Sequence, residues 1–352
     1  MATTISSTIK LASGYEIPRL GFGVCGFMKT CWQKRTNRCL QGLSNVTTPP
    51  SIFLSCLFHV LKPNSVIFSP PEKTKNCCLE ALKCGYRHVS RSVMQLPILL
   101  TQTLFTHIDS AVAYRNEASC GEAIRDPGIS GLLRDQIFFT SKVIDISYVG
   151  AKTTVDETLA KTKLGYIDLM LLHKPMGGSE NRKGAWKALV EAVEAGKVRS
   201  IGVSNYGVHH LDELEQHIGE LEAERGGKGK GGIVSINQVE LHPWLGRKDI
   251  VDWCMTRGIA LEAYCPVVRG ERFKEPAVRK LADKYSKTPA QILIRWSLDK
   301  GFIPLPKSVT PSRIRENGEV FDFQLTPEEV QELETGEYSP VAWDPTVSKL
   351  DD

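Results

Sequence analysis

The sequence predicts an α/β protein in which eight strand–helix units close into a single (β/α)₈ TIM barrel, preceded by an N-terminal β-hairpin. Short apolar runs alternate with amphipathic helical segments along most of the 352 residues. The links between them are short, which favours a parallel sheet covered by helices. Several runs are followed directly by polar residues, and the carboxyl ends of parallel strands converge on one rim of a barrel.

The elements are predicted in chain order. Apolar segments at 9–11 and 17–20 flank Ser13-Gly14-Tyr15 and predict the hairpin, and the first barrel strand follows at 20–24. Later strands are expected at 104–109, 136–141, 166–172, 199–203, 235–240, 260–264 and 303–305. Helices are expected at 72–84, 154–164, 184–195, 208–224, 248–257, 275–285, 289–299 and 327–335. Thr-Pro pairs at 288–289 and 326–327 mark two helix starts.

Two segments, at about 25–69 and 89–107, interrupt the expected domain, which otherwise spans 1–352. Both lack acidic residues and show irregular apolar clusters. The second falls between 85–88 and Ile108, inside what should be one strand. Thr106-His107 resembles the displaced Arg-His pair, so a strand built from 104–109 would keep Asp109 in register. Translated introns and genuine surface insertions both remain open as explanations.

The composition indicates a globular protein. The net charge is +4, but the two interruptions hold six of the 44 basic and none of the 40 acidic residues. The remainder therefore carries −2, which argues against a nucleic-acid surface. The ten cysteines include no CxxC pair, so we expect no metal site. With no secretory signal and no apolar run of about 20 residues, we expect a cytoplasmic protein without a membrane segment.

Four residues form a candidate catalytic set: Asp109, Tyr114, Lys142 and His173 each stand at or just after the end of an apolar run. A set of this kind suits general acid catalysis, in which a side chain gives a proton to an oxygen as charge develops on it. A phenol has a pKa of about 10, which a neighbouring ammonium lowers. We therefore assign the acid to Tyr114, its tuning to Lys142, the holding of Lys142 to Asp109, and a hydrogen bond to the substrate oxygen to His173. Taken singly, each residue is better explained by an ordinary structural role, and it is the ordered set of four that indicates a catalytic site.

Three motifs place the chain near a known family. They lie at 164–169, 196–205 and 303–308, the last reading Ile-Pro-Leu-Pro-Lys-Ser. With them the chain resembles the aldo-keto reductases over roughly 1–24, 70–88 and 108–340. In that family the four residues above form the catalytic tetrad. The resemblance implies an NADP-dependent oxidoreductase that reduces an aldehyde or ketone to an alcohol, taking the 4-pro-R hydride of NADPH. It also implies a small-molecule carbonyl substrate and a monomer.

The cofactor site is predicted near the C-terminus. No Gly-x-Gly-x-x-Gly follows a strand, so a Rossmann site is not indicated. Instead, cations and hydroxyls gather beside a helix start, which suits a phosphate. The resemblance assigns this segment to the adenosine 2′-phosphate and adenine, and assigns three polar residues and one stacking ring to the nicotinamide. The candidate cofactor residues are Lys307, Ser308, Val309, Thr310, Arg313, Glu316 and Asn317, with Ser204, Asn205, Gln238 and Tyr264 at the nicotinamide.

The chain departs from the family around the substrate. Ile144, Lys174 and Cys25 stand where relatives often have aromatic residues, and Cys265 replaces a common Ser. Trp244 and Trp343 are candidate replacement walls, or simply packing. Two other functions stay open: a noncatalytic NADPH-binding barrel that acts as a regulatory subunit, and an inactive product of a mis-spliced gene model.

Overall fold

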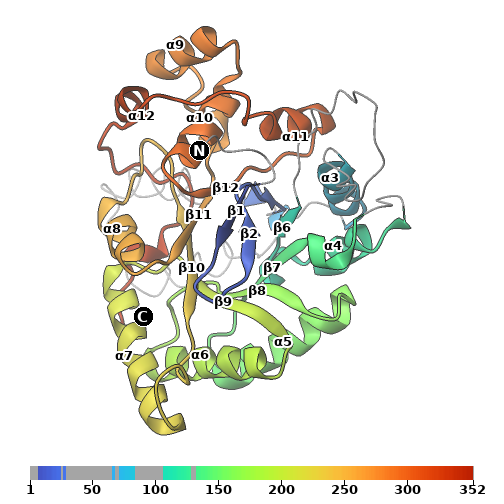
Figure 1. Ribbon diagram of the computed structural model, residues 1–352, viewed down its shortest axis with the longest axis vertical. Helices are drawn as coiled ribbons and strands as arrows, with labels where there is room; N and C mark the ends of the chain where they lie inside the picture. Colours follow the sequence, from blue (N-terminus) through green and yellow to red (C-terminus); the bar gives the residue numbers. More distant parts are fainter. Residues whose placement is uncertain are drawn as a thin grey trace, which may run out of the picture.

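The predicted barrel is present and closed. The computed structural model describes residues 7–24, 27–28, 66–67, 71–83, 106–127 and 132–351. Eight strands form one sheet in the order β12-β11-β10-β9-β8-β7-β6-β3 (Figure 1), and the pairs along it are parallel. The N–H groups of Gly21 and Gly23 donate to the carbonyls of Pro304 (3.1 Å) and Pro306 (3.2 Å). These bonds join the two ends of the sheet.

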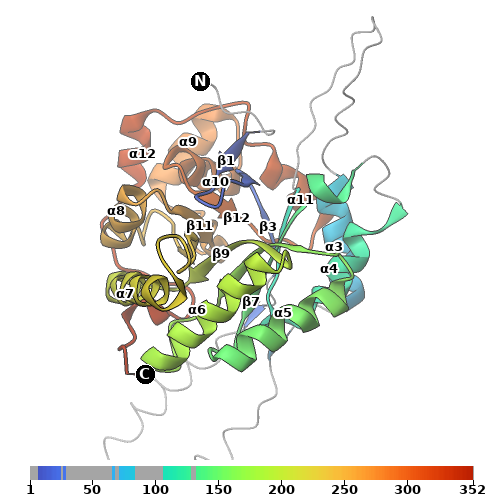
Figure 2. The same cartoon turned by 60° about the horizontal axis from the view of Figure 1, so that its bottom comes forward.

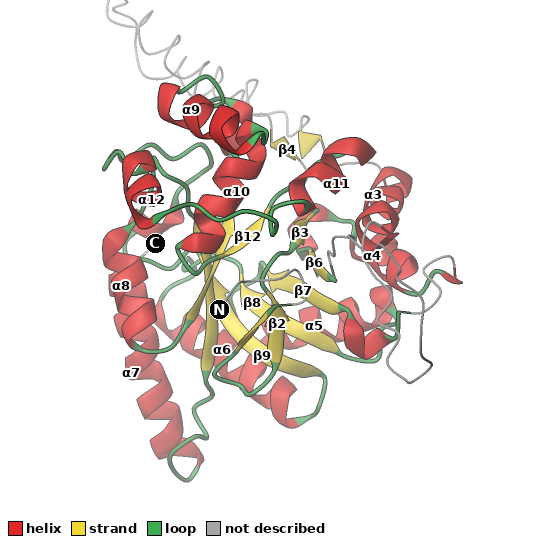
Figure 3. Cartoon of the chain, turned by 45° about the horizontal axis from the view of Figure 1, so that its top comes forward, coloured by secondary structure: helices red, strands yellow, loops and turns green. Residues whose placement is uncertain are grey.

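The helices surround this sheet, as Figure 3 shows with helices in red and strands in yellow. The barrel strands are β3 (Phe22–Gly23), β6 (His107–Asp109), β7 (Phe138–Val143), β8 (Ile167–Leu172), β9 (Val198–Ser204), β10 (Val234–Glu240), β11 (Ala260–Tyr264) and β12 (Ile303–Leu305). The helices are α3 (Pro71–Lys83), α4 (Glu117–Ile124), α5 (Tyr148–Thr162), α6 (Ser179–Glu194), α7 (Val208–Arg225), α8 (Lys248–Thr256), α9 (Pro276–Tyr285), α10 (Pro289–Asp299), α11 (Pro311–Gly318) and α12 (Pro327–Leu333). In Figure 2, α5, α6 and α7 follow one another along one flank. Every helix of the described residues is too short or too polar to cross a membrane.

The hairpin is also present, with β1 (Thr8–Lys10) antiparallel to β2 (Glu16–Pro18). Each expected helix is found, although several bounds move. The prediction missed α4, whose Gly121 lies so close to α5 that a Cβ there would approach the Thr162 carbonyl oxygen to 2.3 Å. It also missed the start of α5, where the Ser147 hydroxyl caps the helix by accepting from the Gly150 N–H (3.0 Å).

The interruption before Asp109 does not displace the catalytic strand. In β6, Ile108 pairs with Phe22 of β3 and Phe139 of β7, and Asp109 pairs with Gly23 and Thr140. The strand therefore uses His107 from the end of the second interruption, as the alternative register predicted. Most of segments 25–69 and 89–107 lies outside the described residues. The described parts of the first are β4 (Phe27–Met28) and β5 (Val66–Ile67), which pair antiparallel.

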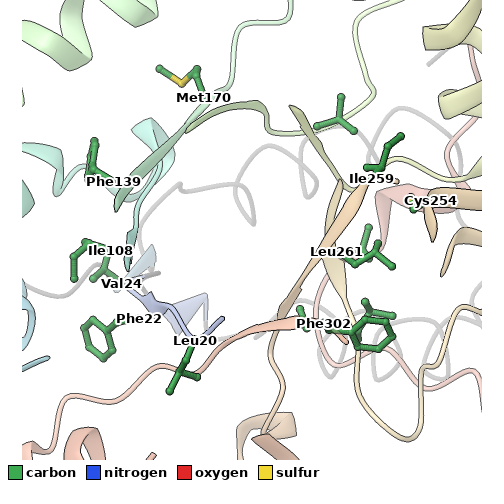
Figure 4. Close-up of a cluster of buried hydrophobic side chains, with 14 of the residues drawn as sticks. Leu20, Phe22, Val24, Ile108, Phe139, Met170, Cys254, Ile259, Leu261 and Phe302 are labelled. Carbon is green, nitrogen blue, oxygen red and sulfur yellow. The ribbon is translucent and has the colours of Figure 1, made fainter. Parts of the chain in front are cut away.

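The two faces of the barrel wall differ. Figure 4 shows one buried apolar cluster whose side chains, among them Phe139, Met170 and Leu261, lie around the barrel wall and point away from its centre. A smaller cluster joins Ile17 of the hairpin to barrel-strand residues that point inward, including Leu169 and Ile236. Alternation along each strand sends every second side chain inward. The interior is consequently apolar beside the hairpin, and its polar residues lie towards the carboxyl ends.

Two glycines provide a test of this packing. A Cβ at Gly202 in β9 would lie 2.4 Å from the Ile236 carbonyl oxygen of β10, whereas Gly219 on exposed α7 has nothing within 4 Å. We expect Gly202→Ala to lower the free energy of unfolding by about 1–3 kcal/mol through overpacking. Gly219→Ala should raise it by about 0.4–1 kcal/mol by restricting the unfolded chain. Urea denaturation of both variants measures the difference, and equal effects would contradict the close β9–β10 approach.

Candidate active site

A buried ion pair forms the base of the site. Asp109 ends β6 and Lys142 lies near the end of the neighbouring β7, with exposed fractions of 3% and 0%. The Lys142 Nζ donates to both Asp109 carboxylate oxygens, at 2.8 and 2.9 Å, and to the Ser110 carbonyl at 2.7 Å. An ammonium so enclosed depends on its partner, because an unpaired charge in a barrel interior is strongly unfavourable.

Tyr114 and His173 lie above this pair. The Lys142 Nζ is 5.2 Å from the centre of the Tyr114 ring, and the Tyr114 and His173 rings meet edge to face with centroids 5.8 Å apart. Tyr114 closes the short 3₁₀ turn η1 (Val112–Tyr114), which Arg115 ends in a left-handed conformation with φ 53°. The structure thus brings all four predicted catalytic residues together.

A pair of polar residues fixes the segment that carries Tyr114. The Ser110 hydroxyl donates to the Asn116 side-chain oxygen (2.7 Å), and the Asn116 amide donates to the Val24 carbonyl (2.9 Å). Ser110 and Asn116 flank η1 on either side, and both are buried. The turn is therefore anchored to the strand end before it and to the residue that follows β3.

His173 is neutral at physiological pH. Burial lowers its pKa to about 3, with further lowering by the positive charges of Lys142 and Lys174. A neutral imidazole still carries one N–H, so it can donate a hydrogen bond to an uncharged carbonyl oxygen. It cannot serve as a cationic acid at neutral pH.

The four residues predicted at the nicotinamide lie together on the same rim. The Ser204 hydroxyl donates to the Gln238 carbonyl (2.9 Å), and the Tyr264 hydroxyl donates to the Asn205 Oδ1 (2.8 Å). The Asn205 Nδ2 donates to the His173 carbonyl (2.9 Å) and to the Ser204 Oγ (3.1 Å). Asn205 has φ 65°, a left-handed conformation that Asn tolerates better than most residues. This network ties the rim to the tetrad.

Gln238 reaches into the barrel. Its Nε2 donates to the Asp109 Oδ1 (2.9 Å) and to the Glu262 Oε2 (2.6 Å). Both amide hydrogens are thereby committed, and the side-chain oxygen is left to accept. The side-chain nitrogen of Asn205 likewise donates to the His173 carbonyl and to the Ser204 hydroxyl oxygen. The side-chain oxygens of Gln238 and Asn205 are therefore the atoms that this rim offers to the N–H groups of a bound amide.

The predicted phosphate segment follows β12. Lys307 and Ser308 are half-buried, and Arg313 is exposed on the first turn of α11. The Thr310 N–H donates to the Ser308 hydroxyl (3.1 Å). Cations and hydroxyls beside a helix start match the chemistry of a phosphate. Glu316 has a structural contact as well, because its Oε1 accepts from the Thr288 hydroxyl (2.8 Å).

Two side chains inside the barrel were missed by the sequence reasoning. His107 and Glu262 are both 0% exposed and face the tetrad from below. A signal existed for Glu262, since it is a lone acid within the apolar run Ala-Leu-Glu-Ala-Tyr. Of the two candidate walls, Trp244 is 3% and Trp343 57% exposed, and Ile144, which stands in place of a family aromatic residue, is 37% exposed.

The chain matches known proteins over most of its length. The family model for the aldo/keto reductase family matches residues 70–336. An uncharacterised oxidoreductase of Schizosaccharomyces pombe is 43% identical over 273 residues, covering 77% of this chain and 87% of the relative. Methylglyoxal reductase DkgA of Escherichia coli K12 is 38% identical over 231 residues, covering 65% of this chain and 78% of the relative.

Solved structures show the same architecture. An aldo/keto reductase from Brucella melitensis superposes with a TM-score of 0.67 at 30% identity, covering 93% of this chain and 98% of the other. A Bombyx mori aldo-keto reductase, solved in complex with NADP, gives 0.69 at 25% identity, covering 97% and 96%. On the family match and these relatives, the chain belongs to the aldo/keto reductase family of NADP(H)-dependent oxidoreductases.

Proposed function

We propose that this protein reduces an aldehyde or ketone to an alcohol with NADPH, and that Tyr114 protonates the carbonyl oxygen. The observation that carries the proposal is the Lys142 ammonium, which is held by Asp109 and lies 5.2 Å from the Tyr114 ring centre. A positive charge beside a phenol favours its ionisation and so makes it a stronger acid.

The residues divide the work of one step. Bound NADPH supplies the hydride that the carbonyl carbon accepts. Tyr114 gives its phenolic proton to the oxygen as negative charge develops there, and the resulting phenolate is stabilised by Lys142. His173, being neutral, donates a hydrogen bond to the same oxygen and orients it beside Tyr114. A proton from solvent then restores the phenol.

The rim residues favour a bound carboxamide. Gln238 and Asn205 have committed their amide hydrogens, so their oxygens can accept from the amide hydrogens of nicotinamide. Tyr264 supplies the ring for stacking, and Lys307 and Arg313 supply the charges for the 2′-phosphate. The remaining residues of the segment, Ser308, Val309, Thr310, Glu316 and Asn317, would line the adenine end.

A small 2-oxoaldehyde is the first substrate to test, because the Escherichia coli relative is named a methylglyoxal reductase. Ile144 and Lys174 in place of aromatic residues favour compact polar carbonyls over flat aromatic ones. A noncatalytic regulatory role would require that the four assembled residues of the tetrad take part in no reaction.

Tyr114→Phe tests the acid. Removing the hydroxyl should lower kcat for methylglyoxal reduction by ~10²–10⁴, because the phenol is the proposed proton donor. NADPH affinity should change by only a few fold, as measured by fluorescence titration. Tyr15→Phe, on the exposed hairpin at the opposite end, is the control. Turnover retained in the Tyr114 variant would refute the assignment.

Lys307→Ala and Arg313→Ala test the phosphate site. Each should weaken NADPH binding by roughly 1.5–3 kcal/mol, the contribution of a charge-assisted bond, and should leave NADH binding almost unchanged. Arg315→Ala is the matched control on α11, because Arg315 pairs with Glu80 of α3 at 2.6 Å. Calorimetric titration with both nucleotides gives the comparison. Equal losses for NADH and NADPH would place the 2′-phosphate elsewhere.

The low pKa of His173 predicts that the rate of reduction does not change with pH on the acid side of neutrality. An unperturbed histidine titrates between about pH 5 and 8, but His173 stays neutral down to about 3. Reduction should therefore lose no activity to histidine protonation as the pH falls from about 7 to 5. Initial rates at saturating NADPH measure this. A fall in kcat with a midpoint near 6.5 that disappears in His173→Gln would contradict it.

A further inference from the structure

Glu262 is a buried acid that the proposed reaction does not use. It lies in the middle of β11, is 0% exposed, and points into the barrel below the tetrad. Its Oε2 accepts from the Gln238 Nε2 at 2.6 Å, and the same nitrogen donates to Asp109 at 2.9 Å. One amide therefore connects Glu262 to the carboxylate that holds Lys142.

The second oxygen of Glu262 has no hydrogen-bond partner among the described residues. A titratable group close to this oxygen is His107, whose Nε2 lies 3.6 Å from the Oε1. That Nε2 already bonds to the Thr140 hydroxyl (2.9 Å), and the His107 Nδ1 also lacks a partner within the described chain. A buried carboxylate oxygen with no donor is costly unless it carries a proton.

The charges around Glu262 also favour its protonated form. The titratable groups that face Glu262 are His107 and Asp109 from β6 and Lys142 from β7, and Gln238 of β10 is uncharged. Lys142 is already engaged by Asp109 and Ser110. Burial lowers the pKa of His107 to about 3, so this imidazole is neutral. Among the described residues, the charges that act on Glu262 are therefore the carboxylate of Asp109 and the ammonium of Lys142.

Burial is the main cause of a raised pKa at Glu262, to about 8, and the negative charge of Asp109 adds to it. Glu262 is accordingly protonated at neutral pH, and ionises only in alkaline solution. Its folded pKa exceeds that of the unfolded chain, so this group destabilises the fold as the pH rises from about 4.5 towards 8. A glutamine at position 262 would avoid this loss of stability, because it cannot ionise.

We propose that Glu262 is a positioning residue for the acid Tyr114, acting through Gln238, Asp109 and Lys142, and that its ionisation extends the pH range over which Tyr114 stays protonated. The inference rests on the proposed function. At neutral pH, protonated Glu262 leaves Lys142 balanced by one carboxylate. At alkaline pH, its negative charge offsets the field of Lys142 at the phenol, which then holds its proton to a higher pH.

Glu262→Gln separates the two states, because it keeps an acceptor for Gln238 but cannot ionise. The Tyr114 titration is read as the tyrosinate absorbance of each protein minus that of its Tyr114→Phe partner. We expect Tyr114 in Glu262→Gln to ionise at a pH lower by roughly 0.5–1 unit than in the wild type. The alkaline limb of kcat for reduction should move in the same direction by the same amount.

Glu117→Gln is the matched control. Glu117 is also a buried acid, but it lies on α4 and accepts from the hydroxyls of Ser141 (2.6 Å) and Thr158 (2.9 Å), outside the barrel. It should leave the Tyr114 titration in place. If Glu262→Gln does not fold, Glu262→Leu replaces it, since an apolar residue leaves no buried charge. Leu should give the same shift of the titration.

Infrared difference spectra supply a reading without turnover. A protonated-carboxyl band should be present in the wild type at neutral pH, disappear on alkalinisation and be absent from Glu262→Gln. An absent band, an unmoved Tyr114 titration, or a uniform fall in kcat at every pH would each overturn the proposal. A wild type that reduces no carbonyl would refute the proposed function instead, and the tyrosinate and infrared titrations would still decide the role of Glu262.

Discussion

The ion pair between Asp109 and Lys142 is the interaction on which the site depends. Both side chains are buried, so each requires the other, and removal of one partner from such a pair typically costs about 3–5 kcal/mol. The pair also constrains the fold. A shift of β6 by one residue would turn Asp109 out of the barrel and leave Lys142 unpaired. The register of β6 is therefore specified by the chemistry of the interior as well as by its hydrogen bonds, which explains how the strand survives an interruption immediately before it.

The two ends of the barrel interior differ in polarity. Apolar residues from the hairpin and strand starts, such as Ile17 and Leu169, fill the end beside the hairpin. Polar residues fill the remainder, where Gln238 links the tetrad to Glu262 and to the nicotinamide rim. Gln238 bonds to Asp109 and is also a proposed nicotinamide ligand, so the proposed cofactor binding and the proposed tuning of the acid share one side chain.

Much of this could be predicted from the sequence, and the limits have physical causes. The eight strands, the hairpin and the four tetrad residues follow from apolar runs that end in polar residues, because strand ends must meet at one rim. Residues such as Glu262 and His107 could not be assigned, because their role depends on neighbours across the barrel and not on neighbours in the chain. Helix α4 was hidden by Gly121, which weakens a helical pattern but is required by the close contact with Thr162. Most of the two interrupting segments, 25–69 and 89–107, lies outside the described residues.

Hydride transfer by this chain, with both interruptions in place, can be followed with isotope. NADPH that is deuterated at the 4-pro-R position is mixed with the protein and methylglyoxal, and the alcohol product is examined by mass spectrometry. One deuterium is expected on the former carbonyl carbon of the product. Unlabelled product, or no product from folded protein that binds NADPH, would refute carbonyl reduction by this chain.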